Sequence, residues 1–211
     1  MKPNRSTDSE TGAGGGLGFL RQFLRRPSVK EHCPLCGMGL VSVHEHVFEL
    51  STRRLLCLCN LCAILTSGNS EGIYRRIPRR VQFLQDFRMT EWQWDRLQIP
   101  VNLAFFYCNS AMGKIAVGYP SPAGLIEALV GQEVWDALVV DNPVLQKMSP
   151  DVEALLANRM GNRSEYFLVP MDDCFRLIGL MRTSWHGLSG GPEAQKGIDA
   201  FFIWLKGHEH A

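Results

Sequence analysis

The 211 residues carry a net charge of +1 at pH 7, with 22 Lys and Arg against 21 Asp and Glu. A chain of this length can bury a core of its own, and a nearly neutral chain has no overall field that draws it to nucleic acid or to an anionic membrane. No stretch approaches 18 consecutive apolar residues, and the N-terminus lacks the apolar run of a signal peptide. We therefore expect a cytoplasmic protein without a transmembrane helix.

Residues 1–30 are predicted to form a disordered arm. The segment is poor in apolar residues and contains the stretch TGAGGGLG, a composition that cannot offset the loss of chain entropy by burial. Within it, the stretch GFLRQFLRR would place its apolar side chains on one helical face, which could dock on a partner or a membrane surface. A two-turn helix is marginal alone, so an unstructured tail is the simpler expectation.

Residues 31–66 are predicted to form a metal-binding module, because five of the seven cysteines lie in this segment. Two CxxC motifs, Cys33 with Cys36 and Cys59 with Cys62, have the spacing with which pairs of thiolates hold one ion. Gly37 lets the backbone turn back after the first pair. A secreted disulfide scaffold would be shorter and would spread its cysteines through the fold. The pattern therefore indicates a small zinc-ribbon or rubredoxin-like module, with a hairpin between the two motifs.

Cys57, His44 and His46 are candidates for additional ligands. On extended strands the two histidines would project to one side, as would Cys57 and Cys59, and a hairpin would bring the pairs together. Three alternatives remain open. The four cysteines of the CxxC motifs hold a structural zinc, with Cys57 as a small buried residue. Or the three additional residues bind a second metal or join a mixed shell around an iron or iron-sulfur centre. Or Cys57 replaces Cys59 in the zinc site.

Residues 67–211 are predicted to form an α+β domain, in which helices pack on an antiparallel sheet. Residues 101–108 and 114–119 read as the two strands of a hairpin. Residues 165–185, EYFLVPMDDCFRLIGLMRTSW, read as a second hairpin that turns at Asp172 and Asp173.

Three helices are expected in the same domain. The Ser-Pro pairs at residues 121–122 and 149–150 have the residue types of a helix N-cap and first turn. The second of these helices would bury Val152, Leu155 and Leu156. The last helix follows Pro192, and the 3.6-residue spacing of its apolar positions predicts burial of Ala194, Ile198, Phe201, Phe202 and Leu205.

The stretch YRRIPRR contains the one basic cluster, formed by Arg75, Arg76, Arg79 and Arg80. Arginine runs beside a zinc ribbon can bind nucleic acid, and Tyr74 could stack on a base. The cluster is short and the chain is nearly neutral, so a solvated linker face is the simpler interpretation. Nucleic-acid binding is the alternative function that this cluster suggests.

No catalytic residue is predicted. Residues 187–191, GLSGG, match the G-x-S-x-G pattern of serine hydrolases, but only 20 residues follow them. That is too short for the strands that deliver the acid and the histidine of such an enzyme. A non-enzymatic role is therefore expected.

The stretches CPLCG, HEH, LLCLCNLCAIL, IPVNLAFFY, YPSPAG and EYFLVPMDDCFRLIGLMRTSWHGLSGG together resemble a bacterial family of uncharacterised proteins encoded near uptake NiFe hydrogenases. The resemblance spans residues 31–206. It implies an accessory role in hydrogenase maturation, assembly or electron transfer, with a hydrogenase subunit or precursor as protein partner. The family pattern covers all seven candidate ligands, which favours the enlarged metal shell: Cys33, Cys36, His44, His46, Cys57, Cys59 and Cys62.

Overall fold

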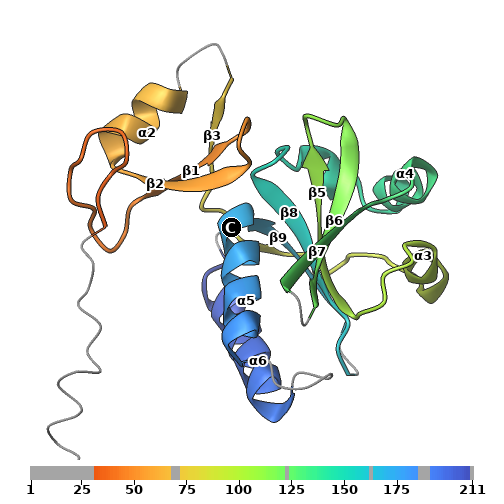
Figure 1. The fold of residues 1–211 in the computed structure, drawn as a ribbon. Coiled ribbons are helices and arrows are strands. Elements are labelled where there is room, and N and C mark those ends of the chain that lie inside the picture. The colour runs from red at the N-terminus through yellow and green to blue at the C-terminus, as the bar shows by residue number, and fades with distance from the viewer. Residues whose placement is uncertain (1–30, 68–71, 122–123, 162–163, 185–190, 210–211) are drawn as a thin grey trace, which may run out of the picture. The chain divides into compact units, whose positions relative to one another are not determined.

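The computed structural model describes residues 31–67, 72–121, 124–161, 164–184 and 191–209. The predictions for the N-terminal arm and for residues 187–190 of the GLSGG motif lie outside this range. Residues His32–Ala211 form one compact unit that contains two antiparallel sheets (Figure 1). Among the described residues, no helix has the length and apolar character needed to cross a membrane. The domain boundaries near residues 30 and 66 stay predictions.

The smaller sheet has three strands in the order β2-β1-β3. Strands β1 (Glu45–Glu49) and β2 (Arg54–Leu58) form the hairpin expected between the two CxxC motifs, and β3 (Tyr74–Arg76) pairs with the other edge of β1. Helix α2 (Asn60–Ser67) follows β2 directly. We call residues 32–67 together with β3 the metal module.

The larger sheet has six strands in the order β4-β9-β8-β5-β6-β7, and each neighbouring pair is antiparallel. The predicted hairpin is confirmed as the pair β5 and β6, which Asn109 and Lys114 close. The strands are β4 (Gln82–Phe83), β5 (Leu103–Asn109), β6 (Lys114–Ser121), β7 (Gly124–Leu129), β8 (Glu153–Asn158) and β9 (Glu165–Pro170).

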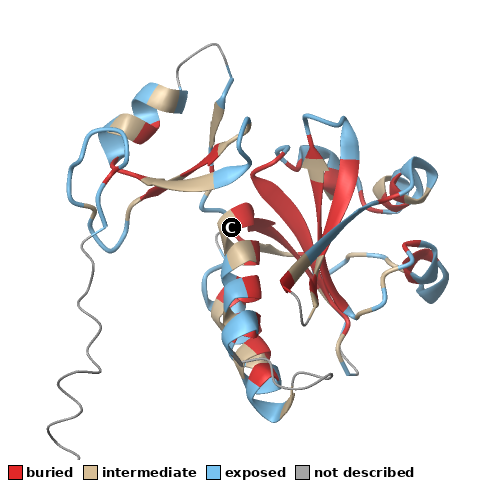
Figure 2. Cartoon of the chain, viewed as in Figure 1, coloured by how far each residue is buried: buried red, intermediate tan, exposed pale blue. Residues whose placement is uncertain are grey.

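Helices cover both faces of the larger sheet (Figure 1). Phe105 and Leu156 pack in the cluster formed with α5 (Met171–Ser184) and α6 (Gly191–Gly207). Phe106 and Leu155, their neighbours along the strands, pack with α3 (Glu91–Arg96), α4 (Gln132–Asp141) and the 3-10 helix η1 (Pro143–Lys147). The central strands are therefore buried on both sides (Figure 2). This confirms an α+β fold with antiparallel sheets and packed helices.

The last helix is confirmed, and α6 buries the five predicted side chains. The other two predicted helices are wrong, because Gly124–Leu129 is strand β7 and Glu153–Asn158 is strand β8. All six residues of β8 are buried, since the strand lies between β5 and β9 with helices on both faces. A strand buried on both faces has a continuous apolar sequence without alternation, and here the residues are also good helix formers.

The prediction of a second hairpin is correct for its first strand and wrong for its turn and second strand. Strand β9 forms, but Asp172 and Asp173 lie in the first turn of helix α5 and not in a hairpin turn. Buried side chains recur along this helix with helical spacing: Met171, Cys174, Leu177, Ile178 and Met181. That period was readable in the sequence, and the two aspartates are also favourable at a helix N-terminus, where the helix dipole is positive.

Candidate metal centre

Cys33, Cys36, Cys59 and Cys62 lie together, with their four sulfur atoms within 4.8 Å of one another. The Sγ atoms of Cys36 and Cys59 are 3.6 Å apart. Zinc-sulfur bonds of about 2.3 Å in a tetrahedron place two sulfurs about 3.8 Å apart. The four cysteines therefore have the spacing of ligands to a single ion, and Cys59, not Cys57, belongs to this group.

Local backbone structure holds the first CxxC motif. Gly37 adopts a φ of 76°, which favours glycine, and its N–H donates to the carbonyl oxygen of Cys33 at 2.8 Å. The N–H of Cys33 donates in turn to the carbonyl oxygen of Met38 at 2.8 Å. The result is a tight turn that points both sulfurs inward.

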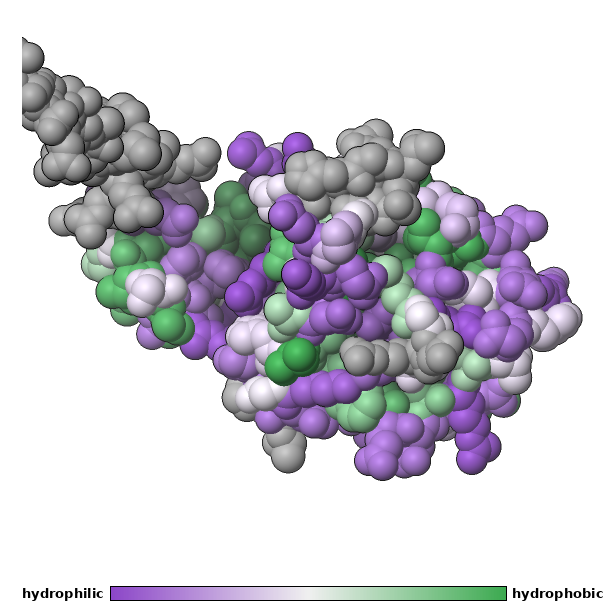
Figure 3. All heavy atoms as spheres, turned by 90° about the horizontal axis from the view of Figure 1, so that it is seen from below, coloured by the Kyte–Doolittle hydropathy of each residue, from purple (hydrophilic) through white to green (hydrophobic). Residues whose placement is uncertain are grey.

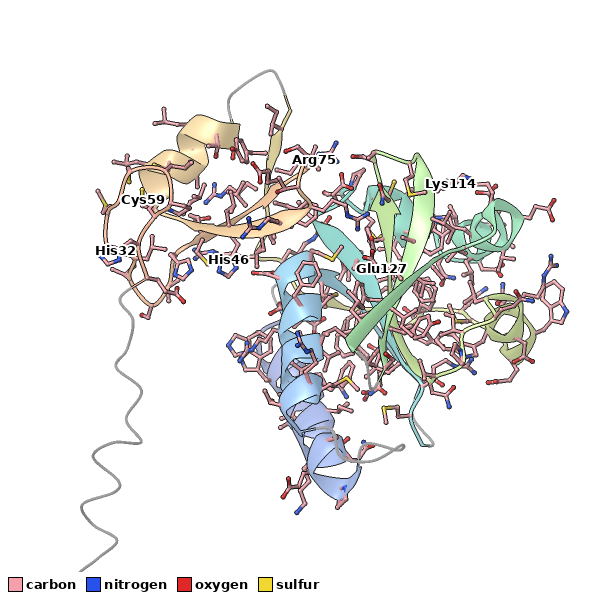
Figure 4. All side chains as sticks on the ribbon, viewed as in Figure 1. His32, His46, Cys59, Arg75, Lys114 and Glu127 are labelled. Carbon is pink, nitrogen blue, oxygen red and sulfur yellow. The ribbon has the colours of Figure 1, made fainter. Side chains whose placement is uncertain are left out.

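The second motif is held by a strand end and a helix start. Cys59 follows the last residue of β2, and Cys62 lies in the first turn of α2. The N–H of Ala63 donates to the carbonyl oxygen of Cys59 at 3.0 Å, so the helix begins at the ligand pair. Figure 4 labels Cys59 at this junction.

The four cysteine thiols shift one another's pKa values. Burial raises the pKa of the Cys33 thiol, but hydrogen bonds from the backbone of Cys59, Leu35 and Cys36 outweigh it and lower the pKa to about 6. Hydrogen bonding to the thiols of Cys59 and Cys36 raises the pKa of Cys62 to about 12. One thiolate in this group therefore disfavours a second, and all four deprotonate together only where a cation balances their charge.

His44, His46 and Cys57 form a second, separate group, in which the ligand-type atoms again lie within 4.8 Å of one another. His46 and Cys57 are direct partners across the β1/β2 pair, and the Nε2 atoms of the two histidines are 3.2 Å apart. Sequence reasoning expected Cys57 and Cys59 to face the same way. The two side chains belong to different groups because β2 ends at Leu58, which lies between Cys57 and Cys59.

Asp172 is a residue of this group that sequence reasoning missed. Its carboxylate accepts a hydrogen bond from Nδ1 of His46, and this bond raises the pKa of the histidine. Asp172 lies 126 positions further along the chain, at the start of α5. No local signal in the sequence connects the two residues, because only the packing of α5 beside the metal module brings them together.

A cavity of about 440 Å³ opens beside the second group. Its walls include His44 and His46, Asp172 and Asp173 from α5, Trp204 from α6, and His208, which directly follows α6. Burial raises the pKa of Asp173 to about 6, with the neighbouring charge of Asp172 adding to the effect. The cavity therefore combines two imidazoles from the metal module with acidic and aromatic groups from the helices.

The four arginines of the basic cluster all face carboxylates of the same chain. The three carboxylates that they face, those of Glu45, Asp151 and Glu153, are buried. The pairs are Arg75 with Asp151 at 2.9 Å, Arg76 with Glu45 at 2.8 Å, Arg79 with Glu45 at 2.8 Å and Arg80 with Glu153 at 2.8 Å. The cluster thus makes ion pairs within the metal module and with Asp151 and Glu153, at the start of strand β8 of the larger sheet.

Comparison with known proteins shows to which family this chain belongs. A family model described as a family of unknown function (DUF5947) matches residues 32–209, most of the chain. No curated protein and no solved structure matches it. The match spans both groups of candidate ligands and both sheets.

Proposed function

Because the chain belongs to the DUF5947 family, whose function is unknown, we propose a role from the site itself: the protein is a metal-binding accessory protein that acts through contacts with another protein. The observation that carries this proposal is the convergence of four cysteine sulfurs from two distant motifs. Four such ligands complete a tetrahedral shell, so the ion organises the module and leaves no position for a substrate.

Zinc is the ion proposed for this group. Four thiolates in a tetrahedron suit zinc or iron, and the knuckle at Gly37 is of the kind found in zinc ribbons. The core of the metal module supports a structural role, because its own buried cluster among the described residues contains only Cys33, Val47, Leu58, Cys59 and Ala63, while Phe48 packs in the cluster of the larger sheet. Iron in the same shell would add electron transfer to that role.

The surface of the metal module supports a protein partner. Helix α2 exposes Leu61, Ile64 and Leu65, which lie at helical spacings of three and four residues and so share one face. Figure 3 shows apolar residues at the surface of this part of the molecule. Since Cys62 lies in the same helix, the metal would order the helix that presents this face. Exposed apolar faces of this kind mark interaction sites.

A subunit or precursor of a NiFe hydrogenase is the partner that we propose, on the strength of the sequence resemblance. In this role the protein would assist maturation, assembly or electron transfer. The nucleic-acid alternative is less well supported, because phosphate binding by Arg75, Arg76, Arg79 and Arg80 would have to break the ion pairs that these residues make within the chain.

Two measurements test this proposal. Metal analysis and an absorption spectrum of anaerobically purified protein should show zinc and no visible thiolate-to-iron bands. Co-expression with hydrogenase subunits should yield a complex that Leu65→Asp weakens at least tenfold. Val140→Asp is the matched control, because Val140 is equally apolar and exposed but lies on α4. A protein without metal, or equal binding by both variants, would contradict the proposal.

A further inference from the structure

We propose that His44, His46 and Cys57 form a second metal site, which binds a divalent transition-metal ion and leaves one coordination position open to the neighbouring cavity. This goes beyond the accessory role proposed above, since a closed four-cysteine site explains none of the three residues.

The spacing of the ligand atoms fits one ion. The two Nε2 atoms are 3.2 Å apart, and zinc-nitrogen bonds of about 2.0 to 2.1 Å in a tetrahedron require about 3.3 Å. One ring nitrogen of each histidine and the Sγ atom of Cys57 lie within 4.8 Å of one another. Strand pairing fixes this arrangement, because His46 and Cys57 are opposite each other on β1 and β2.

Hydrogen bonds fix the imidazoles with their Nε2 lone pairs directed at each other. Nδ1 of His44 lies 2.9 Å from the carbonyl oxygen of Val41, which can only accept, so Nδ1 carries the hydrogen. Nδ1 of His46 donates to the carboxylate of Asp172. With both rings neutral, each presents a lone pair at Nε2, and two lone pairs at 3.2 Å repel unless a metal ion or a shared proton lies between the two nitrogens. The metal ion is the occupant proposed here. Carboxylate-histidine-metal arrangements have this form.

The chemistry of the ligand atoms indicates the kind of ion. Two imidazole nitrogens and one thiolate are borderline-to-soft ligands, which suit Zn²⁺ and its first-row neighbours and not Mg²⁺ or Ca²⁺. Three protein ligands leave the fourth tetrahedral position to water or to an incoming ligand, as in catalytic zinc sites. The four-cysteine group, in contrast, fills its shell with protein atoms.

The cavity provides access to that fourth position. His44 and His46 line it, together with Arg79, Asp172, Asp173 and Trp204. The His46 side chain is 30% exposed, so water reaches the ring. An ion here has a coordination position open to solvent, whereas four sulfur atoms fill every position in the four-cysteine site. The second site is therefore the exchangeable metal site of the protein.

The test counts metal ions on the full chain, purified anaerobically and titrated with Zn²⁺ against a chelator. We expect two equivalents for the wild type and one for Cys57→Ser. Cys108→Ser is the matched control, because Cys108 is a half-buried strand cysteine outside both groups, and it should retain two. One equivalent of Zn²⁺ in the wild type, or two in Cys57→Ser, would overturn the proposal. The two histidines would then not share a metal ion.

Co²⁺ loading separates this proposal from the structural role of the first site. The first equivalent should show intense thiolate-to-cobalt absorption from four sulfurs, and the second a weaker band from one sulfur that is lost in Cys57→Ser. If the four-cysteine site does not bind Co²⁺, the intense band is lost. The weaker band is lost with it only if the module unfolds, which circular dichroism detects. Two intense bands, or no second band, would contradict a mixed nitrogen and sulfur shell.

Asp172 is a positioning residue in this proposal, and its variant gives a second test. Asp172→Asn should weaken binding of the second Zn²⁺ by about 10- to 100-fold, the usual effect of losing such a partner, without changing the first. Asp173→Asn is the matched control, since Asp173 lines the same cavity without a hydrogen bond to His46, and it should change the affinity by roughly threefold or less. Equal affinities for both variants would contradict the role of Asp172.

Discussion

The metal module and the larger sheet obtain their stability in different ways. The buried cluster of the module has five residues, and two of these are the candidate ligands Cys33 and Cys59. The larger sheet has a buried cluster on each face, with 21 residues on the side of α5 and α6, one of which is Phe48 from β1 of the module, and 16 on the other side. Burial of this extent can support a domain, whereas five residues cannot offset the entropy of ordering the module.

This difference assigns separate tasks to the two regions. The sheet is a self-sufficient scaffold, and it supplies Asp172 to the second histidine group through α5. On the proposed function the module depends on its ligands, and we expect its surface and its second group of ligands to be ordered only when the first site is filled. Four predictions test the comparison.

The largest expected effect is the response to metal removal. Binding energies of about 10 to 16 kcal/mol are typical of structural zinc in small modules, far more than the module core can replace. After anaerobic chelation, hydrogen exchange should show complete loss of protection in β1 and α2 and retained protection in β5 and β8. Cys62→Ser should give the same pattern. Protection of the module in protein shown to be free of metal would remove the distinction between the two regions.

The next effect concerns the scaffold. Leu156 is fully buried in the central strand β8, so Leu156→Ala should lower the free energy of unfolding by about 2 to 5 kcal/mol in urea titrations. Ile203 is 70% exposed on α6, and Ile203→Ala should change it by about 0.5 kcal/mol or less. If the two variants were equally stable, the sheet would not be the main source of stability.

Two glycines of the scaffold should respond to alanine in opposite ways. A Cβ atom on Gly118 in β6 would lie 2.4 Å from the ring of Phe105, which is buried and cannot move away. Gly118→Ala should therefore cost about 1 to 3 kcal/mol in the same titration. A Cβ atom on Gly179 in α5 would meet nothing within 4 Å, so Gly179→Ala should stabilise by about 0.5 to 1 kcal/mol. If both variants changed the free energy of unfolding in the same direction, the packing described around these two glycines would be wrong.

The smallest effect is a pH dependence at the contact between the two regions. The hydroxyl of Tyr107 in β5 accepts a hydrogen bond from Arg53 of the module and donates to Glu127 at 2.8 Å. Burial and then the bond to Glu127 raise the pKa of Tyr107 to about 12. The folded state therefore holds this proton more tightly than the unfolded chain, whose tyrosine has the ordinary pKa of about 10.

The sign of the effect follows from this difference in pKa. The stabilisation is complete below about pH 10 and is lost as the pH rises toward 12. Urea midpoints measured across this range should fall less steeply for Tyr107→Phe than for the wild type. Parallel slopes would show that Tyr107 titrates alike in both states.

For the metal centre, the local part of the arrangement was predictable. The CxxC spacing, the turn at Gly37 and the hairpin between the motifs are properties of short segments, and the structure has the turn and the hairpin where they were expected. The relation of His46 to Asp172 and the cavity beside them was not predictable, because they depend on where α5 packs.

For the fold, short-range patterns sufficed where one face of an element is buried and the other is solvated. The hairpin of β5 and β6 is buried on both faces, but its two short apolar runs joined by a turn were still predicted. Helix α6 belongs to this class, and it was predicted. Strand β8 does not, because burial on both faces removes the alternation that identifies a strand, and its residues favour a helix when read alone.

The amino-acid sequence alone thus determined the ligand types, their spacing and the helix with a single apolar face, since each depends on neighbouring residues. Only the tertiary structure decided that β8 is a central strand and that the seven candidate ligands divide into two groups. The physical reason is the same in both cases: strand pairing and burial between layers depend on residues that are not neighbours in the sequence, which local preference does not encode.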